Sequence, residues 1–301
     1  MARLLESVPN FSEGRRPDVV RDIVAAATAS SGVRVLDWSS DPDHNRSVVT
    51  LVGEPEAVLE AVKAMTSRAL RQIDLRVHQG SHPRIGAMDV IPLIPLTGLT
   101  MADAAAAARR LAAELAAEYD LPVYLYGEAA TRPANRDLSR VREGQFEGLA
   151  AVIGKPERTP DYGPSLVHPT AGATAVGARG PLIAFNVNLD TADLGIARKI
   201  AREIRESGGG LPAVKAIGLS LAERGQTQVS MNLTDFRRTS IGEAYRAVAD
   251  AAKACGASVV ESEIVGLVPA EALLEEAARS LRLSGFRPDQ VLELRLLDEQ
   301  G

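Results

Sequence analysis

Cysteine is nearly absent from this chain. Cys255 is the single thiol among 301 residues, so an internal disulfide and a zinc site built from several cysteines are both excluded. Hydrophobic residues make up 46% and charged residues 24% of the chain, which are ordinary values for a soluble protein. The length is sufficient for one large domain or two of ordinary size, with a sizeable core.

Long hydrophobic runs are also absent. No stretch of about 18 apolar residues is available to cross a bilayer, and Met1–Glu6 lacks the long apolar core of a secretory signal. The alanine-rich run 102–117 contains Asp103, Arg109 and Glu114, so it is predicted to be a helix of a soluble domain. We therefore expect no membrane partner and a cytoplasmic location.

Clusters of like charge are the third absence. The formal net charge is −5, from 34 Lys and Arg against 39 Asp and Glu, and no run of one sign stands out. Proteins that bind nucleic acids or membrane surfaces in general usually carry a basic stripe. We therefore expect no nucleic-acid partner.

One short segment, His78–Asp89, concentrates polar chemistry. It holds two histidines, an arginine, an aspartate, two glycines and a proline, just before the apolar run Val90–Leu96. Gly80, Pro83 and Gly86 interrupt any helical period. The segment is therefore predicted to be a rigid loop that leads into a buried strand.

His82 is the first candidate for chemistry in this loop. The proline that follows biases its backbone toward extended conformations, and a histidine titrates near neutral pH, which suits proton transfer. The alternative is a structural loop whose histidines only satisfy backbone groups. His78 and His82 are spaced like a helical metal pair, but Gly80 makes a helix unlikely here, so we expect no metal and a supporting role for His78.

The order of elements repeats along the chain. Apolar periodicity and breakers predict strand, helix, strand, strand, helix, strand in the first half and again after residue 180. The predicted strands are Leu4–Val8, Val33–Trp38, Arg46–Val52, Ala87–Leu96, Leu182–Leu189, Ala213–Leu221, Thr227–Thr234 and Ser258–Val265. This βαββαβ order is typical of ferredoxin-like modules, so we expect an α/β (α+β) fold of two such subdomains with facing sheets and helices outside.

The predicted boundary lies near residue 180. The first subdomain is expected over residues 1–179 and the second over residues 180–301, where it ends in a helical tail. Gly154–Gly180 is rich in proline and glycine and lacks clear periodicity, which is typical of a linker or a binding loop.

Several motifs in register resemble those of a known family. Besides the His82 loop, they are Ser7–Gly14, Leu125–Ala130, Tyr162–Ser165, Gly172–Arg179 and Ala184–Leu189. Together they closely resemble the glutamate formimidoyltransferase (formiminotransferase) family, including the transferase half of formiminotransferase-cyclodeaminase. The resemblance extends from about residue 3 to about residue 280.

This resemblance implies an activity and its partners. The family transfers a formimidoyl group between N-formimidoyl-L-glutamate and tetrahydrofolate in histidine breakdown, with folate bound in a channel where two α/β subdomains meet. Tetrahydrofolate is then a co-substrate, no metal is required, and the small-molecule partners are the folate and the glutamate derivative. The resemblance also allows a homodimer.

The resemblance further implies catalytic positions. His82 corresponds to the family's catalytic histidine and would accept the proton. Arg46 matches the family's Asn-Arg pair and suits a substrate carboxylate or the pterin, although a surface ion pair is the alternative. Where the family has an acidic residue, this chain has Ser39. Asp37 or Asp41 can replace it, and Asp41 is included among the catalytic candidates.

Folate contacts are implied in two further segments. The first comprises Gly163, Pro164, Ser165, Leu166, Val167, His168, Pro169, Thr170, Ala171 and Gly172, unless this glycine-flanked segment is only a linker. The second lies near Lys215, where the family is often more basic. Asn186 and Asn188 are two residues apart on one predicted strand, so they share a face and either mark a polar site or bond the sheet.

Two other functions are compatible with these residues. The same site can serve a glutamate formyltransferase, because an amidine and an amide differ by one NH versus O. The third possibility is a non-catalytic folate-binding protein. Ser39 and the small number of basic residues near Lys215 favour it mildly, whereas the complete His82 loop argues against it.

Overall fold

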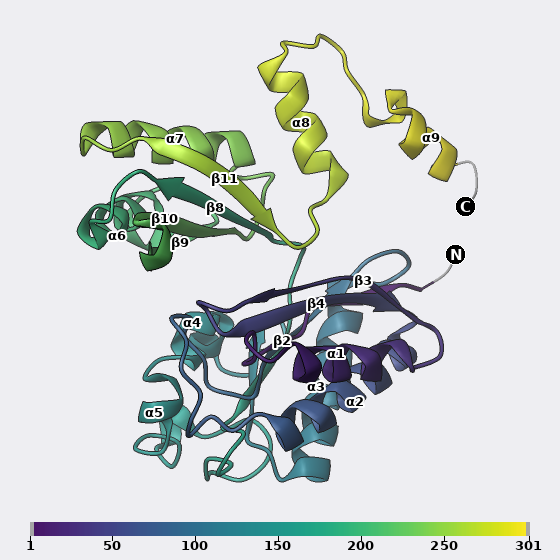
Figure 1. Ribbon diagram of the computed structural model, residues 1–301. Helices are drawn as coiled ribbons and strands as arrows, with labels where there is room; N and C mark the ends of the chain where they lie inside the picture. The colour runs from purple at the N-terminus through teal and green to yellow at the C-terminus, as the bar shows by residue number, and fades with distance from the viewer. Residues whose placement is uncertain (1–2, 299–301) are drawn as a thin grey trace. The chain divides into compact units, whose positions relative to one another are not determined.

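The computed structural model describes residues 3–298, and the chain forms two compact units, Met1–Gly180 and Pro181–Gly301 (Figure 1). Residues 1–2 and 299–301, the outer ends of the two expected subdomains, lie outside the described residues. Each unit combines one sheet with helices, which confirms the predicted α+β class. The expected facing arrangement of the two sheets stays a prediction.

The first unit begins with a βαββαβ module. Its elements are β1 (Leu5–Ser7), β2 (Asn10–Phe11), α1 (Pro17–Thr28), β3 (Val33–Asp41), β4 (Arg46–Gly53), α2 (Pro55–Gln72) and β5 (Met88–Pro95). β1 and β2 both lie between β4 and β5 and replace the single strand predicted there. Pro9 separates them, because proline cannot donate to a strand ladder.

Two parallel strands extend this sheet beyond β5. After α3 (Met101–Tyr119), the chain forms β6 (Val123–Gly127), and β7 (Thr174–Ala178) lies between β5 and β6. The prediction of an irregular segment throughout 154–180 is therefore wrong for β7. All five β7 residues are buried, and a strand buried on both faces lacks the polar–apolar alternation that reveals most strands.

Helices cover both faces of this sheet. α1, α2 and α3 pack on one face over a core that includes Phe11, Ile23 and Met65 (Figure 1). A smaller core on Tyr124 and Tyr126 is closed by α4 (Leu138–Val141) and α5 (Gln145–Leu149). The sequence predicts a mostly helical stretch up to about Ile153, whereas these two helices are short and turns separate them.

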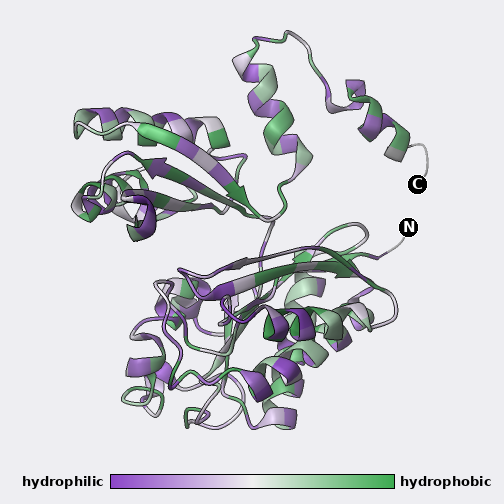
Figure 2. Ribbon diagram, in the orientation of Figure 1, coloured by the Kyte–Doolittle hydropathy of each residue, from purple (hydrophilic) through white to green (hydrophobic). Residues whose placement is uncertain are grey.

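The second unit repeats the module. It contains β8 (Ile183–Leu189), α6 (Leu194–Ile204), β9 (Val214–Leu221), β10 (Gln226–Leu233), α7 (Ile241–Ala254) and β11 (Val259–Val265), followed by α8 (Ala270–Ser280) and α9 (Leu292–Asp298). The strand order β11-β8-β10-β9 matches the order β5-β1/β2-β4-β3 of the first unit. Hydrophilic and hydrophobic residues are interspersed along α6 and α7 (Figure 2), as expected of helices that bury one side.

Short 3₁₀ turns connect several elements. They are η1 (Pro133–Arg136), η2 (Pro156–Arg158), η3 (Glu206–Gly208), η4 (Ala222–Arg224) and η5 (Pro288–Gln290). In the part of the chain that the structure describes, no helix is both long and apolar enough to span a membrane.

Two loops of the first unit pair through their backbones. The Ala87 N–H donates to Ala171 O at 2.8 Å, and the Ala173 N–H donates to Ile85 O at 2.9 Å. Gly86 lies at the centre of this contact, where a Cβ atom would stand 1.9 Å from Ala173 O. The close approach therefore requires a residue without a side chain at position 86.

We predict that Gly86→Ala lowers the free energy of unfolding of the first unit by roughly 1–3 kcal/mol, because a methyl group must displace backbone. The single tryptophan, Trp38, lies on β3, so its fluorescence during urea titration reports on this unit. Gly148→Ala is the matched control, because a Cβ there meets no atom within 4 Å. Equal stability of the two variants would contradict the tight contact at Gly86.

Candidate active site

His82 lies in the loop that precedes β5, with its side chain partly exposed. Its Nδ1 is 2.8 Å from Pro83 O, and the Arg46 guanidinium contacts the ring at both nitrogens. A carbonyl only accepts hydrogen bonds and a guanidinium only donates them. A neutral ring has one acceptor nitrogen, so Arg46 can donate to only one of the two. The proton is assigned to Nδ1, where the Pro83 carbonyl accepts it, and Nε2 presents the lone pair to Arg46.

The surroundings of His82 keep its ring neutral. Burial lowers the pKa of His82 well below its ordinary value, and the positive charges of Arg46 and Arg142 lower this pKa further. A neutral imidazole is the form that can take up a proton at neutral pH. The ring is therefore in the protonation state of a general base.

Arg46 begins β4 and points its guanidinium at His82. A second nitrogen of this guanidinium donates to Asn10 Oδ1, while the buried Nε has no partner among the described residues. Burial and the charge of Arg142 lower the pKa of Arg46 to about 9, so the side chain stays charged at neutral pH. It offers an unused donor beside the candidate base.

A buried ion pair supports the same loop. Asp89 is 1% exposed and accepts a hydrogen bond from Arg142 through one oxygen and from the Ile85 N–H, at 2.8 Å, through the other. The Nε of Arg142 is buried without a partner among the described residues. Sequence reasoning missed Asn10, Asp89 and Arg142. Asn10 lies in the motif Ser7–Gly14, and Asp89 ends the segment His78–Asp89. Nothing in the sequence connects Arg142 to the site.

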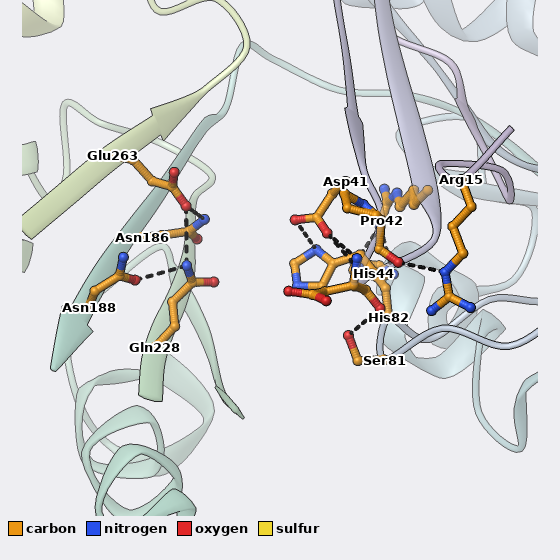
Figure 3. A network of polar contacts seen from close by, with 12 residues as sticks. Arg15, Asp41, Pro42, His44, Ser81, His82, Asn186, Asn188, Gln228 and Glu263 are labelled. Carbon is orange, nitrogen blue, oxygen red and sulfur yellow. Dashed lines mark hydrogen bonds and ion pairs between the residues drawn. The ribbon is translucent and has the colours of Figure 1, made fainter. Parts of the chain in front are cut away.

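Asp41 lies at the end of β3, directly opposite Arg46 in the β3–β4 ladder. Its Oδ2 is 3.4 Å from Nδ1 of His44, and its Oδ1 accepts the His44 N–H at 2.8 Å. The His44 ring is 5.8 Å from the His82 ring, between centroids (Figure 3). Asp37 is opposite Thr50, farther along the strand, so Asp41 is the nearer of the two acidic candidates.

Both ring nitrogens of His78 have hydrogen-bond partners. Its Nε2 is 2.9 Å from Asn45 O, and its Nδ1 accepts from Arg84 Nε at 2.9 Å. Arg84 also pairs with Glu147 at 2.7 Å, which ties the loop to α5. No group of three or more His, Cys, Asp or Glu suited to a metal ion occurs within the described residues.

A small pocket connects these groups. It is lined by Ser12, His44, Asn45, Arg46, His78, His82, Arg84 and Asp89. The structure therefore brings His82 and Arg46 into contact and places Asp41 beside them through His44.

The candidate folate segment 163–172 lies next to the His82 loop. Its end pairs with residues 85–87 through the backbone contacts described above. His168 braces the loop, because its Nδ1 accepts the Ala171 N–H at 3.0 Å. Leu166 is 72% exposed, so the segment presents an apolar side chain on a braced backbone.

The remaining candidates share one face of the sheet in the second unit. Asn188 donates to Glu261 at 3.0 Å. Asn186 donates to Glu263 and Gln228 donates to Asn188, each at 3.0 Å (Figure 3). The two amides therefore do bond neighbouring strands. The exposed Lys215 on β9 is opposite Asn232 and lies on this same face.

Comparison with known proteins places this chain in a family. Residues 4–179 match the N-terminal subdomain of the formiminotransferase domain, and residues 184–284 match the formiminotransferase domain. These two matches cover most of the chain. The chain belongs to the formiminotransferase family, and the resemblance seen in the motifs is confirmed.

Individual relatives match over most of the chain. The glutamate formimidoyltransferase of Streptococcus pyogenes serotype M1 is 44% identical over 99% of this chain and 100% of its own length. That of Thermoplasma acidophilum is 44% identical over 97% of each. The formimidoyltransferase-cyclodeaminase of Rattus norvegicus is 42% identical over 92% of this chain and 52% of its own length.

We predict that the His82 ring titrates below the ordinary histidine value of about 6.5, and that Arg46→Gln raises the pKa of His82, because a neighbouring positive charge is removed. NMR titration of the histidine rings measures both values, with the His82 signals assigned from His82→Gln. Arg15→Gln is the matched control, because Arg15 donates to Pro42 O at 2.7 Å and is not among the charges that act on His82. Equal responses in the two variants would show that the Arg46 charge does not act on His82.

Proposed function

We propose that this protein is a glutamate formimidoyltransferase, which transfers a formimidoyl group from N-formimidoyl-L-glutamate to tetrahydrofolate in histidine degradation. Its family and the names of its relatives support this activity. The observation that carries the proposal is a neutral His82 with its Nε2 lone pair against a charged Arg46. A cytoplasmic location and a homodimer remain predictions.

The reaction requires that the two substrates be positioned against each other and that protons be transferred between their nitrogens. In our proposal, N5 of tetrahydrofolate attacks the formimidoyl carbon while His82 Nε2 accepts the N5 proton. The resulting tetrahedral intermediate then breaks its bond to the glutamate nitrogen. The formimidoyl group ends on N5, and glutamate leaves as the free amine.

Arg46 is proposed to bind a carboxylate of the glutamate substrate. Its planar guanidinium can hold a carboxylate through two parallel hydrogen bonds, and its Nε is available for one of them. This contact would draw the guanidinium away from His82, which frees the Nε2 lone pair for the N5 proton. Substrate binding would thereby activate the base.

The folate contacts are proposed in both units. Residues 163–172 would receive the ligand beside the His82 loop, and the exposed Leu166 suits an aromatic surface. Lys215, Asn186 and Asn188 would contact folate from the second unit, where they share one sheet face. Asp41 is proposed to act as the acidic residue of the site in place of Ser39.

We expect the purified protein to convert tetrahydrofolate with N-formimidoyl-L-glutamate as donor, and His82→Ala to lower kcat about 10²–10⁴-fold, because a general base supplies a rate factor of that size. Product formation followed by absorbance measures the rate, and folate binding checks that the variant is folded. N-formyl-L-glutamate is run in parallel. Turnover with the formyl donor alone would reassign the activity, and His82→Ala above a tenth of wild-type kcat would remove His82 from the mechanism.

We also predict that Arg46→Lys raises the KM for the glutamate donor about tenfold or more, because an ammonium cannot reproduce a two-bond carboxylate contact. Arg15→Lys is the matched control, since Arg15 is an arginine of the same region that bonds Pro42 O. Steady-state kinetics with the donor varied measure the effect. An unchanged KM in Arg46→Lys would limit Arg46 to a structural role.

A further inference from the structure

Formimidoyl transfer moves two protons at two different nitrogens. One leaves N5 of tetrahydrofolate, and another must reach the glutamate nitrogen before that nitrogen departs as an amine. A group that donates the second proton lowers the barrier to breaking the carbon–nitrogen bond. His82 is neutral and serves the first step, so a separate acid near it would serve the second.

His44 has the geometry for this second step. It lines the same pocket as His82, and the two ring centroids are 5.8 Å apart with the planes tilted by 57°. The two rings therefore line one pocket at an angle to each other. Two imidazoles can therefore address two atoms of one tetrahedral centre.

The contacts of the two rings differ in charge. Asp41 holds His44, with 3.4 Å between its Oδ2 and the ring Nδ1, and its other oxygen accepts the backbone N–H groups of Asp43 and His44 at 2.8 Å each. His82 instead contacts the guanidinium of Arg46. A carboxylate suits an imidazolium, whereas a guanidinium suits a neutral ring. Unequal surroundings of this kind assign acid and base to paired titratable groups.

We propose that His44, oriented by Asp41, is the general acid that protonates the departing glutamate nitrogen. This inference rests on the proposed transferase function and names a catalytic residue for it, with Asp41 as the positioning residue. Because His44 Nδ1 faces Asp41, Nε2 carries the proton that is donated.

The step balances without any further reactant. The electron pair of N5 forms the new carbon–nitrogen bond, the π pair of the C=N bond moves onto the imino nitrogen, and the N5 proton goes to His82. The imino nitrogen then returns this pair to re-form the C=N bond while the bond to the glutamate nitrogen breaks. The electron pair of the broken bond stays on the glutamate nitrogen, and the His44 proton binds there. After product release, His82 gives its proton to solvent and His44 takes one back, so both residues return to their starting forms.

Other charged groups surround this turn and enter the pH dependence. Arg15 donates to Pro42 O (Figure 3). Asp43 O accepts from the backbone and hydroxyl of Ser81, and Arg46 is opposite Asp41 in the β3–β4 ladder. Within residues 3–298, the carboxylate that contacts the His44 ring is that of Asp41. Asp41 can thus be separated experimentally from its neighbour Asp43.

The test is the pH dependence of kcat in wild type, His44→Gln and Asp41→Asn, with Asp43→Asn as matched control. We expect His44→Gln to lower kcat at least tenfold and to remove the loss of rate at high pH, because the acid that deprotonates there is gone. Asp41→Asn should move that loss to lower pH, since an imidazolium without its carboxylate gives up its proton more readily. Asn can still accept the two backbone N–H bonds, and Asp43→Asn should cause a smaller shift.

The outcomes separate the inference from the function it rests on. A wild-type protein without transferase activity would overturn the proposed function itself. An active wild type with a His44→Gln profile that keeps the high-pH loss and kcat would overturn the role of His44 alone. If His44→Gln fails to fold, Asp41→Asn decides, because equal shifts in Asp41→Asn and Asp43→Asn would overturn the role of the pair.

Discussion

The backbone pairing between residues 85–87 and 171–173 is the contact on which the candidate site depends. It joins two loops that are more than 80 residues apart in sequence and leads directly into β5 and β7. One loop carries His82, and the other ends the candidate folate segment. The base and the proposed ligand surface are therefore positioned first by main-chain hydrogen bonds, and side chains such as Asp89 and His168 hold the same two loops.

Positive charge is concentrated around the neutral ring of His82. Arg46 and Arg142 both act on His82, and Asp89 balances Arg142 from within the protein. A buried ion pair of this kind contributes little net stability, but removing one partner leaves a costly uncompensated charge. Its effect is to fix the position of Arg142 beside His82.

Much of the fold and part of the site could be predicted from the sequence. Apolar periodicity such as Val20 with Ile23 and Val24 revealed the helices, and the order of helices and strands along the chain indicated two βαββαβ modules. β7 was missed because small buried residues show no alternation. The acidic residue near His82 could not be chosen, because Asp37 and Asp41 share one face of β3. Only the contact of Asp41 with His44 distinguishes the two, and no local pattern indicated it.

The position of β7 also has a consequence for synthesis of the chain. Among the described strands, β6 pairs only with β7, and β7 is made about fifty residues later. While the ribosome extends the chain, β6 has no ladder partner until β7 emerges, after the segment 163–172 has already passed. Because domains generally fold as units during synthesis, the proposed folate surface and the last central strand of the sheet are expected to form together, in the closing event of folding of the first unit.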